Sequence, residues 1–239
     1  MIKKAIIPIA GLGTRFLPLS TVIPKELFPL VDKPAIQYII EEAKASGIQE
    51  IIFIVSPKKK EILDYFKENP ELEKTLKSRN KEGLLKELQK TKEILKGVSF
   101  LSVSQPKPLG DGHAILQAKK LIGKDPCGVF FADDIIDSKI PCFLQLTNIF
   151  RTSQAPIIGL KKVSDDKIPN YGIVEVEKIS SRLYKVKKVY IPVSYNFNLL
   201  SSISFWSRYS FIRTSSSPFP LHLSHLNSPL RASQNSQSQ

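Results

Sequence analysis

Two glycines and two cationic side chains near the N-terminus are the first residues whose types and spacing could do chemistry. Gly11 and Gly13 follow the apolar run 3–10, and Arg15 and Lys25 come shortly after them. Glycines at the end of a strand let the backbone approach a ligand closely, and successive N–H groups can surround phosphate oxygens. Arg15 offers a planar fork of donors and Lys25 a point charge, so the segment could hold a polyphosphate. A tight turn with two surface cations is the alternative that these residues leave open.

The same glycine pattern excludes two common classes of nucleotide-binding protein. The segment lacks the third glycine of a dinucleotide fingerprint, and it does not match the GxxxxGK[ST] loop. Neither a Rossmann dehydrogenase nor a P-loop NTPase is therefore expected.

A second candidate site is the loop QPKPLGDGHA, in which Gln105 stands close to Gly110. An amide side chain offers both a donor and an acceptor, which suits the recognition of the edge of a base. A plain Pro/Gly loop is the alternative. His113 stands at the start of the following helical segment, where a cap or a loop contact is expected rather than catalysis.

The third candidate is Asp133 in the sequence FFADD. A carboxylate at the end of a buried strand is well placed to hold Mg²⁺ against phosphates, because Mg²⁺ binds few carboxylates and keeps its waters. Asp134 and Asp137 are interpreted as helix caps.

The elements that must position these residues follow from the hydrophobic pattern. Short apolar runs with β-branched residues predict strands, and they alternate with segments of helical spacing. The predicted strands span 3–10, 50–56, 99–104 and 128–131; the predicted helices span 35–46, 59–66, 70–95 (one or two), 114–121 and 141–150. This alternation predicts an α/β fold with a mainly parallel sheet and helices on both faces. The loops that carry Gly11, Gln105 and Asp133 should then converge at the carboxyl ends of the strands.

The second half of the chain has a different pattern. The apolar run 155–163 and the alternating segments 172–178 and 182–190 predict further strands, which would give the sheet a mixed edge. From about residue 190 the chain is rich in serine and free of acidic residues. We therefore predict a domain over residues 1–189 and a poorly ordered tail over 190–239.

Composition narrows the class of protein. The chain has 35 Lys and Arg against 22 Asp and Glu, a formal net charge of +13, and 42% hydrophobic residues. Acids and bases are mixed through the predicted helices, so a polyanionic small substrate is favoured over nucleic acid. No apolar run approaches the roughly 18 residues of a membrane helix, which predicts a cytoplasmic protein that does not bind a membrane. The two cysteines, Cys127 and Cys142, are too few for a disulfide scaffold.

Taken together, the motifs resemble a known family. GLGTRFLP, PKELFPLVDKPAIQYIIEEAKASGI, QPKPLGDGHAI, ADDIID and YGIVEVE are similar, in order and spacing, to segments of the bacterial UTP–glucose-1-phosphate uridylyltransferases, also called UDP-glucose pyrophosphorylases. The resemblance covers about residues 3–189. GLGTR with PKE resembles a motif of the wider sugar-nucleotidyltransferase family, which includes thymidylyltransferases. PLVDKPxIQY, the polar helical insert and GDGHA together indicate the uridylyltransferase branch.

The resemblance implies the nucleotide-diphospho-sugar transferase fold, a Rossmann-like mixed sheet, and transfer of UMP from UTP to glucose 1-phosphate with Mg²⁺. Arg15 would hold the leaving phosphates, Lys25 would stabilise charge at the α-phosphate, and Asp133 would bind the metal. Gly172 would contact the sugar. The residues implied at the nucleotide are Ala10, Gly11, Gly13, Thr14, Gln105 and Gly110. Relatives are often dimers or tetramers, so a homo-oligomer is possible.

The C-terminal part departs from the family pattern. A VEKP-like strand and a DCG-like segment, which supply sugar ligands and a second metal ligand in the family, do not occur after the sequence KVKKV. We therefore expect a truncated or frameshifted product, with a divergent tail as the alternative. Two alternative functions stay open. The chain could be a thymidylyltransferase, or a protein that binds a nucleotide without catalysing its transfer.

Overall fold

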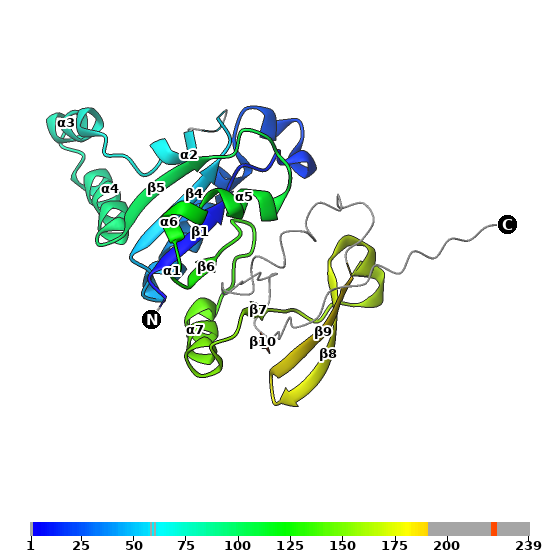
Figure 1. Cartoon of the computed structure of the whole chain (residues 1–239). Helices are drawn as coiled ribbons and strands as arrows, with labels where there is room; N and C mark the ends of the chain where they lie inside the picture. Colours follow the sequence, from blue (N-terminus) through cyan, green and yellow to red (C-terminus); the bar gives the residue numbers. More distant parts are fainter. Residues whose placement is uncertain (1, 58, 60, 191–220, 224–239) are drawn as a thin grey trace.

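A computed structural model describes residues 2–57, 59, 61–190 and 221–223. Its centre is a parallel sheet with the strand order β5-β4-β1-β6 (Figure 1). The strands are β1 (Lys4–Pro8), β4 (Glu50–Val55), β5 (Ser99–Ser104) and β6 (Cys127–Val129). The middle strands are apolar on both faces and are almost completely buried. These strands match the predicted ones, because a parallel sheet covered on both sides needs continuous apolar runs.

Helices cover both faces of this sheet, as predicted. On one face, Ile7 and Phe53 pack with Ile36 and Ile40 of α1 (Ala35–Ala45) and with α7 (Cys142–Ser153). On the other face, Ile6, Ile52 and Ile54 of β1 and β4 pack against α5 (Asp111–Gln117) and α6 (Lys119–Ile122). The helix predicted over 114–121 therefore begins earlier and is divided at Ala118.

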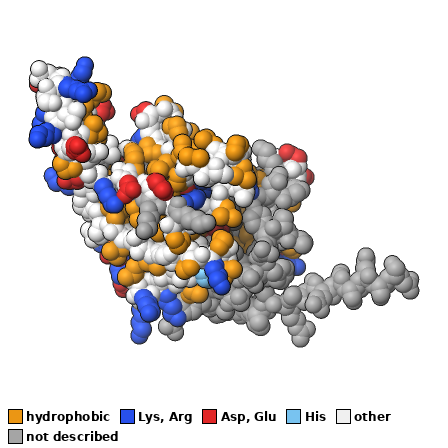
Figure 2. Space-filling view, turned by 90° about the horizontal axis from the view of Figure 1, so that it is seen from above, with side chains coloured by type: hydrophobic (Ala, Val, Ile, Leu, Met, Phe, Trp, Pro, Cys, Tyr) orange, Lys and Arg blue, Asp and Glu red, His pale blue; other side chains and the backbone are white. Residues whose placement is uncertain are grey.

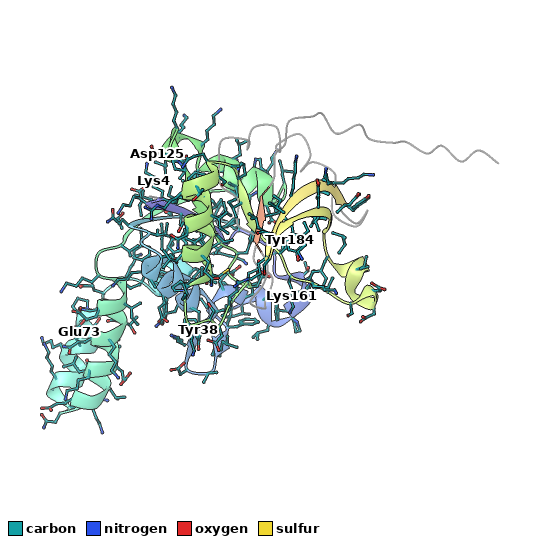
Figure 3. The ribbon with its side chains drawn as sticks, turned by 90° about the horizontal axis from the view of Figure 1, so that it is seen from below. Lys4, Tyr38, Glu73, Asp125, Lys161 and Tyr184 are labelled. Atoms are coloured by element: carbon teal, nitrogen blue, oxygen red, sulfur yellow. The ribbon has the colours of Figure 1, made fainter. Side chains whose placement is uncertain are left out.

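Two polar helices project from the body of the molecule. They are α3 (Pro70–Ser78) and α4 (Glu82–Leu95), which form the projecting hairpin in Figures 1 and 3. Lys44 of α1 anchors it by donating to the carbonyl of Glu93 at 2.9 Å. The short helix α2 (Glu61–Asp64) precedes them and covers only part of the predicted helix 59–66.

The later strands form a sheet of their own, which corrects the prediction of a mixed edge. β7 (Ile157–Gly159), β8 (Ile173–Ser180) and β9 (Leu183–Tyr190) join β10 (Leu221–Leu223) in the order β7-β10-β9-β8. β8 and β9 form an antiparallel hairpin in which most residues of β8 are exposed. Such a hairpin does not suit a sheet buried on both faces. Apart from Tyr190 and β10, the predicted tail 190–239 lies outside the described residues.

A chain of short turns joins β1 to α1. It comprises η1 (Thr14–Phe16), η2 (Leu19–Thr21), η3 (Lys25–Leu27) and the small hairpin of β2 (Pro29–Leu30) with β3 (Lys33–Pro34). These turns lie at the upper end of the sheet in Figure 1, where the parallel strands have their carboxyl ends. At the opposite end, Lys4 pairs with Asp125 at 3.3 Å (Figure 3). Within the described part of the chain, no helix has the length and apolar character needed to cross a membrane.

Candidate active site

The two glycines after β1 serve different purposes. A Cβ atom on Gly11 would meet nothing within 4 Å, so this position borders open space. Gly13 has φ 68°, and a Cβ there would lie 3.0 Å from Cβ of Ser20. The Ser20 hydroxyl also donates to the carbonyl of Gly13 at 2.8 Å. Gly13 is thus required by backbone conformation and packing, whereas Gly11 leaves room for a ligand.

Lys25 and Asp133 meet at the carboxyl end of the sheet. Nζ of Lys25, in η3, lies 3.0 Å from Oδ2 of Asp133, which follows β6. The two side chains are 23% and 56% exposed, so both can reach solvent or a ligand. The loops after β1 and β6 therefore converge, as the parallel topology predicted.

A lysine that the sequence analysis did not single out joins this cluster. Lys59, which follows β4, donates from Nζ to the carbonyl of Gly11 and lies 3.7 Å from Oε2 of Glu26. The Glu26 side chain is only 1% exposed, and its Oε2 accepts no hydrogen bond from the described residues. Burial raises the pKa of the Glu26 carboxyl, and the nearby Lys59 ammonium opposes this effect.

The only sequence signal for Lys59 is a run of three lysines directly after a strand. Neither partner of Lys59 is close to it in the sequence, so no local pattern could identify the contact.

Gln105 extends the pairing of β5 with β4, because its backbone N–H donates to the carbonyl of Val55 at 2.8 Å. Its side chain is buried, at 5% exposure. The amide nitrogen lies 3.2 Å from the carbonyl of Gly110 and 2.9 Å from Nδ1 of His113. His113 therefore makes the expected loop contact, and Gly110, with φ 95°, adopts a conformation that favours glycine.

The remaining predicted residues lie on the segments around this centre. Thr14 and Arg15 are exposed in η1, and Gly172 is exposed directly before β8. Ala10, two residues after β1, is buried, at 5% exposure. In Figure 1, the end of the β8–β9 hairpin at which β8 begins is the one nearer to the turns η1 to η3.

The predicted helix caps Asp134 and Asp137 are not the caps of the next helix. Helix α7 begins at Cys142 with Pro141 as its N-cap. Its backbone N–H at Phe143 instead donates to Oε1 of Glu42, on α1, at 3.0 Å. Burial raises the pKa of the Glu42 carboxyl, while hydrogen bonds from the backbone of Phe143 and Cys142 lower it.

Charged and apolar side chains share the surface around the glycine loop. Figure 2 views the molecule from this end and shows apolar side chains interspersed with charged ones. Exposed apolar residues of the turns after β1 include Leu12, Leu17 and Val22, at 64%, 57% and 80% exposure. Cations beside an open glycine loop can neutralise a phosphate chain, and apolar neighbours strengthen such interactions by lowering the local dielectric constant.

Comparisons with known proteins identify the family to which the chain is similar. The model of the nucleotidyl transferase family matches residues 4–189. Over 187 residues the chain is 41% identical to a UTP–glucose-1-phosphate uridylyltransferase of Staphylococcus haemolyticus, covering 78% of this chain and 64% of that relative. The chain thus spans somewhat less than two thirds of the length of that relative.

Solved structures give the same result for the fold. A UDP-glucose pyrophosphorylase from Acinetobacter baumannii superimposes with a TM-score of 0.75 at 32% identity, covering 92% of this chain and 88% of that one. A UTP-bound UGPase from the same organism has a TM-score of 0.73 at 30% identity, with 95% and 87% coverage. The α/β nucleotidyltransferase fold predicted from the sequence is confirmed.

Proposed function

Because the chain belongs to the nucleotidyl transferase family, we propose that it transfers UMP from UTP to glucose 1-phosphate and releases pyrophosphate. The observation that carries this proposal is the 41% identity to a uridylyltransferase over 187 residues. The convergence of Gly11, Lys25 and Asp133 at one end of the sheet supports it. UTP is a cytoplasmic metabolite, so the reaction would take place in the cytoplasm. The predicted homo-oligomer stays a prediction.

In the proposed complex, the glycine loop receives the nucleotide. Gly11 borders open space, and its neighbours Ala10, Gly13 and Thr14 would present backbone N–H groups to the ribose and phosphates. Gln105 and Gly110 would meet the uracil base at the end of β5. Gly172, before β8, would contact the sugar of glucose 1-phosphate.

The proposed chemistry needs charge neutralisation more than proton transfer. An oxygen of the sugar phosphate, already anionic, attacks the α-phosphorus of UTP, and the bond from that phosphorus to the pyrophosphate oxygen breaks. Lys25 would stabilise the charge at the α-phosphate, and Arg15 would hold the departing phosphates. No general base is required, because the nucleophile carries no proton at the attacking oxygen.

Asp133 suits a divalent cation that is held mainly by phosphates. Its carboxylate is 56% exposed and stands at the carboxyl end of a buried strand. Mg²⁺ commonly binds one or two carboxylates together with substrate phosphates and waters, so a lone carboxylate fits. When bound, Mg²⁺ would neutralise phosphate charge. Because Lys25 pairs with Asp133 in the free protein, the lysine would turn from the carboxylate to the α-phosphate in the complex.

The test is pyrophosphate release from UTP and glucose 1-phosphate in the presence of Mg²⁺. We expect turnover that prefers UTP to dTTP and that falls by at least about 100-fold in an Asp133→Ala variant. Preference for dTTP would indicate a thymidylyltransferase. Binding of UTP without turnover would indicate a nucleotide-binding protein that does not catalyse the transfer, and would contradict the proposal.

A further inference from the structure

The side-chain amide of Gln105 is held by two partners of the protein itself. Its nitrogen lies 3.2 Å from the carbonyl oxygen of Gly110 and 2.9 Å from Nδ1 of His113. Within the described part of the chain, these are the hydrogen bonds of the amide, and both involve its nitrogen. His113 is itself half-buried, and on its other edge the amide nitrogen of Gln117 lies 3.1 Å from Nε2.

The chemistry of the two partners fixes which way the amide faces. A backbone carbonyl can only accept, so the atom of Gln105 that faces Gly110 must be its NH₂ group. The same nitrogen approaches Nδ1 of His113, which accepts its second hydrogen in the tautomer that carries the ring proton on Nε2. In this tautomer Gln117 does not donate to the ring, because its amide nitrogen donates to the carbonyl of His113 at 3.1 Å. Both hydrogens of the Gln105 NH₂ group are thereby used within the protein.

The other end of the amide is consequently available to a ligand as an acceptor. The carbonyl oxygen Oε1 of Gln105 can accept a hydrogen bond but cannot donate one. Uracil presents N3–H, a donor, whereas cytosine presents a bare N3 at the same position. A fixed Oε1 thus favours a uracil base and leaves an acceptor opposite an acceptor when cytosine is bound.

Gly110 alone would hold the amide less firmly. With a single hydrogen bond at 3.2 Å, the amide could turn about its last torsion and offer its NH₂ group to N3 of cytosine. The second hydrogen bond, to His113, opposes that rotation. We propose that His113 is a positioning residue that makes the site discriminate uridine from cytidine nucleotides by locking the orientation of Gln105. This inference rests on the proposed function, because it concerns the base-binding part of the same site.

A pair of variants that differ by one methylene group tests the role of Nδ1. Asn at position 113 can place an acceptor near the position of Nδ1, whereas the longer Gln places its amide near that of Nε2. We therefore expect His113→Asn to keep the UTP preference of the wild type. His113→Gln should lower the ratio of UTP affinity to CTP affinity by about tenfold, the effect of one hydrogen bond. A role of His113 in packing alone would affect both variants alike.

The readout is the dissociation constant of UTP and of CTP, each with Mg²⁺, measured by calorimetry on the full chain. Gln117→Ala is the matched control, because it removes the side chain that faces the other ring nitrogen and should leave the ratio unchanged. Thermal melting shows that each variant is folded. If His113→Asn and His113→Gln keep the same ratio as the wild type, the inference is wrong while the proposed function stands. A wild type that does not bind UTP would overturn both.

Discussion

Replacement of Lys59 by Met should destabilise the fold by an amount that depends on pH. The Lys59 side chain is 12% exposed and faces the 1% exposed carboxylate of Glu26 at 3.7 Å. Removal of one partner of a buried ion pair typically costs 3–5 kcal/mol, and the length of this contact places the loss near the lower end, about 3 kcal/mol at pH 8. The lost hydrogen bond to Gly11 would add about 1 kcal/mol at every pH.

The titration of the Glu26 carboxyl determines whether the loss of stability grows or shrinks as the pH rises. Burial already raises the pKa of Glu26 above 4.5 in the folded protein, so the folded state binds more protons than the unfolded state just above that pH. Stability contributed by this group is therefore present at low pH and is lost as the pH rises through the folded pKa. Without Lys59, the pKa of Glu26 in the folded protein rises further, because the ammonium group that opposes the effect of burial is absent. The gap between wild type and variant should accordingly widen from pH 4.5 to pH 8.

Urea unfolding at a series of pH values measures this gap as a difference in unfolding free energy. Glu26→Gln provides the control, because it removes the charge and keeps the shape of the side chain. In that background, Lys59→Met should cost only about 1 kcal/mol and should show little pH dependence. An equal cost of Lys59→Met at pH 4.5 and pH 8, or the same cost with and without Glu26, would refute the reasoning.

Three further substitutions test contacts that hold the glycine loop, β6 and α7 in place, and each is measured by thermal or urea unfolding. Gly13→Ala should lose about 1–2 kcal/mol, because alanine at φ 68° is strained and its Cβ would crowd Ser20; an unchanged midpoint would contradict this. Gly128→Ala should lose at least about 3 kcal/mol, because the new Cβ would lie 2.3 Å from the Phe143 ring. Glu42→Ala should lose about 1–3 kcal/mol by freeing the N–H of Phe143 at the start of α7, whereas a surface-like loss below 0.5 kcal/mol would argue against that contact.

Most of the central sheet could be predicted from the sequence, because β1, β4 and β6 are buried. The run EIIFIV is continuous in apolar residues and became β4, with Ile51 to Ile54 fully buried. Once the strands were known, right-handed crossovers brought Gly11, Gln105 and Asp133 to one end of the sheet. The glycine loop and its cations were therefore predictable from local sequence together with topology.

Contacts between distant segments could not be predicted in this way. The hydrogen bond from Lys59 to Gly11 and the one from Phe143 to Glu42 join residues 48 and 101 positions apart. A buried carboxylate such as Glu26 has no sequence signal of its own, because its burial depends on tertiary packing. The separate second sheet was also missed, because alternation in β8 and β9 indicates a hairpin but not the strands that pair with it.

Hydrogen exchange with and without UTP and Mg²⁺ tests most directly whether the loops after β1, β5 and β6 form one nucleotide site. We predict slower exchange in residues 10–15 and 105–113 and around Asp133. The projecting hairpin of α3 and α4 serves as an internal control and should not change. Protection confined to other segments, or no protection at saturating UTP, would contradict the assignment of this site.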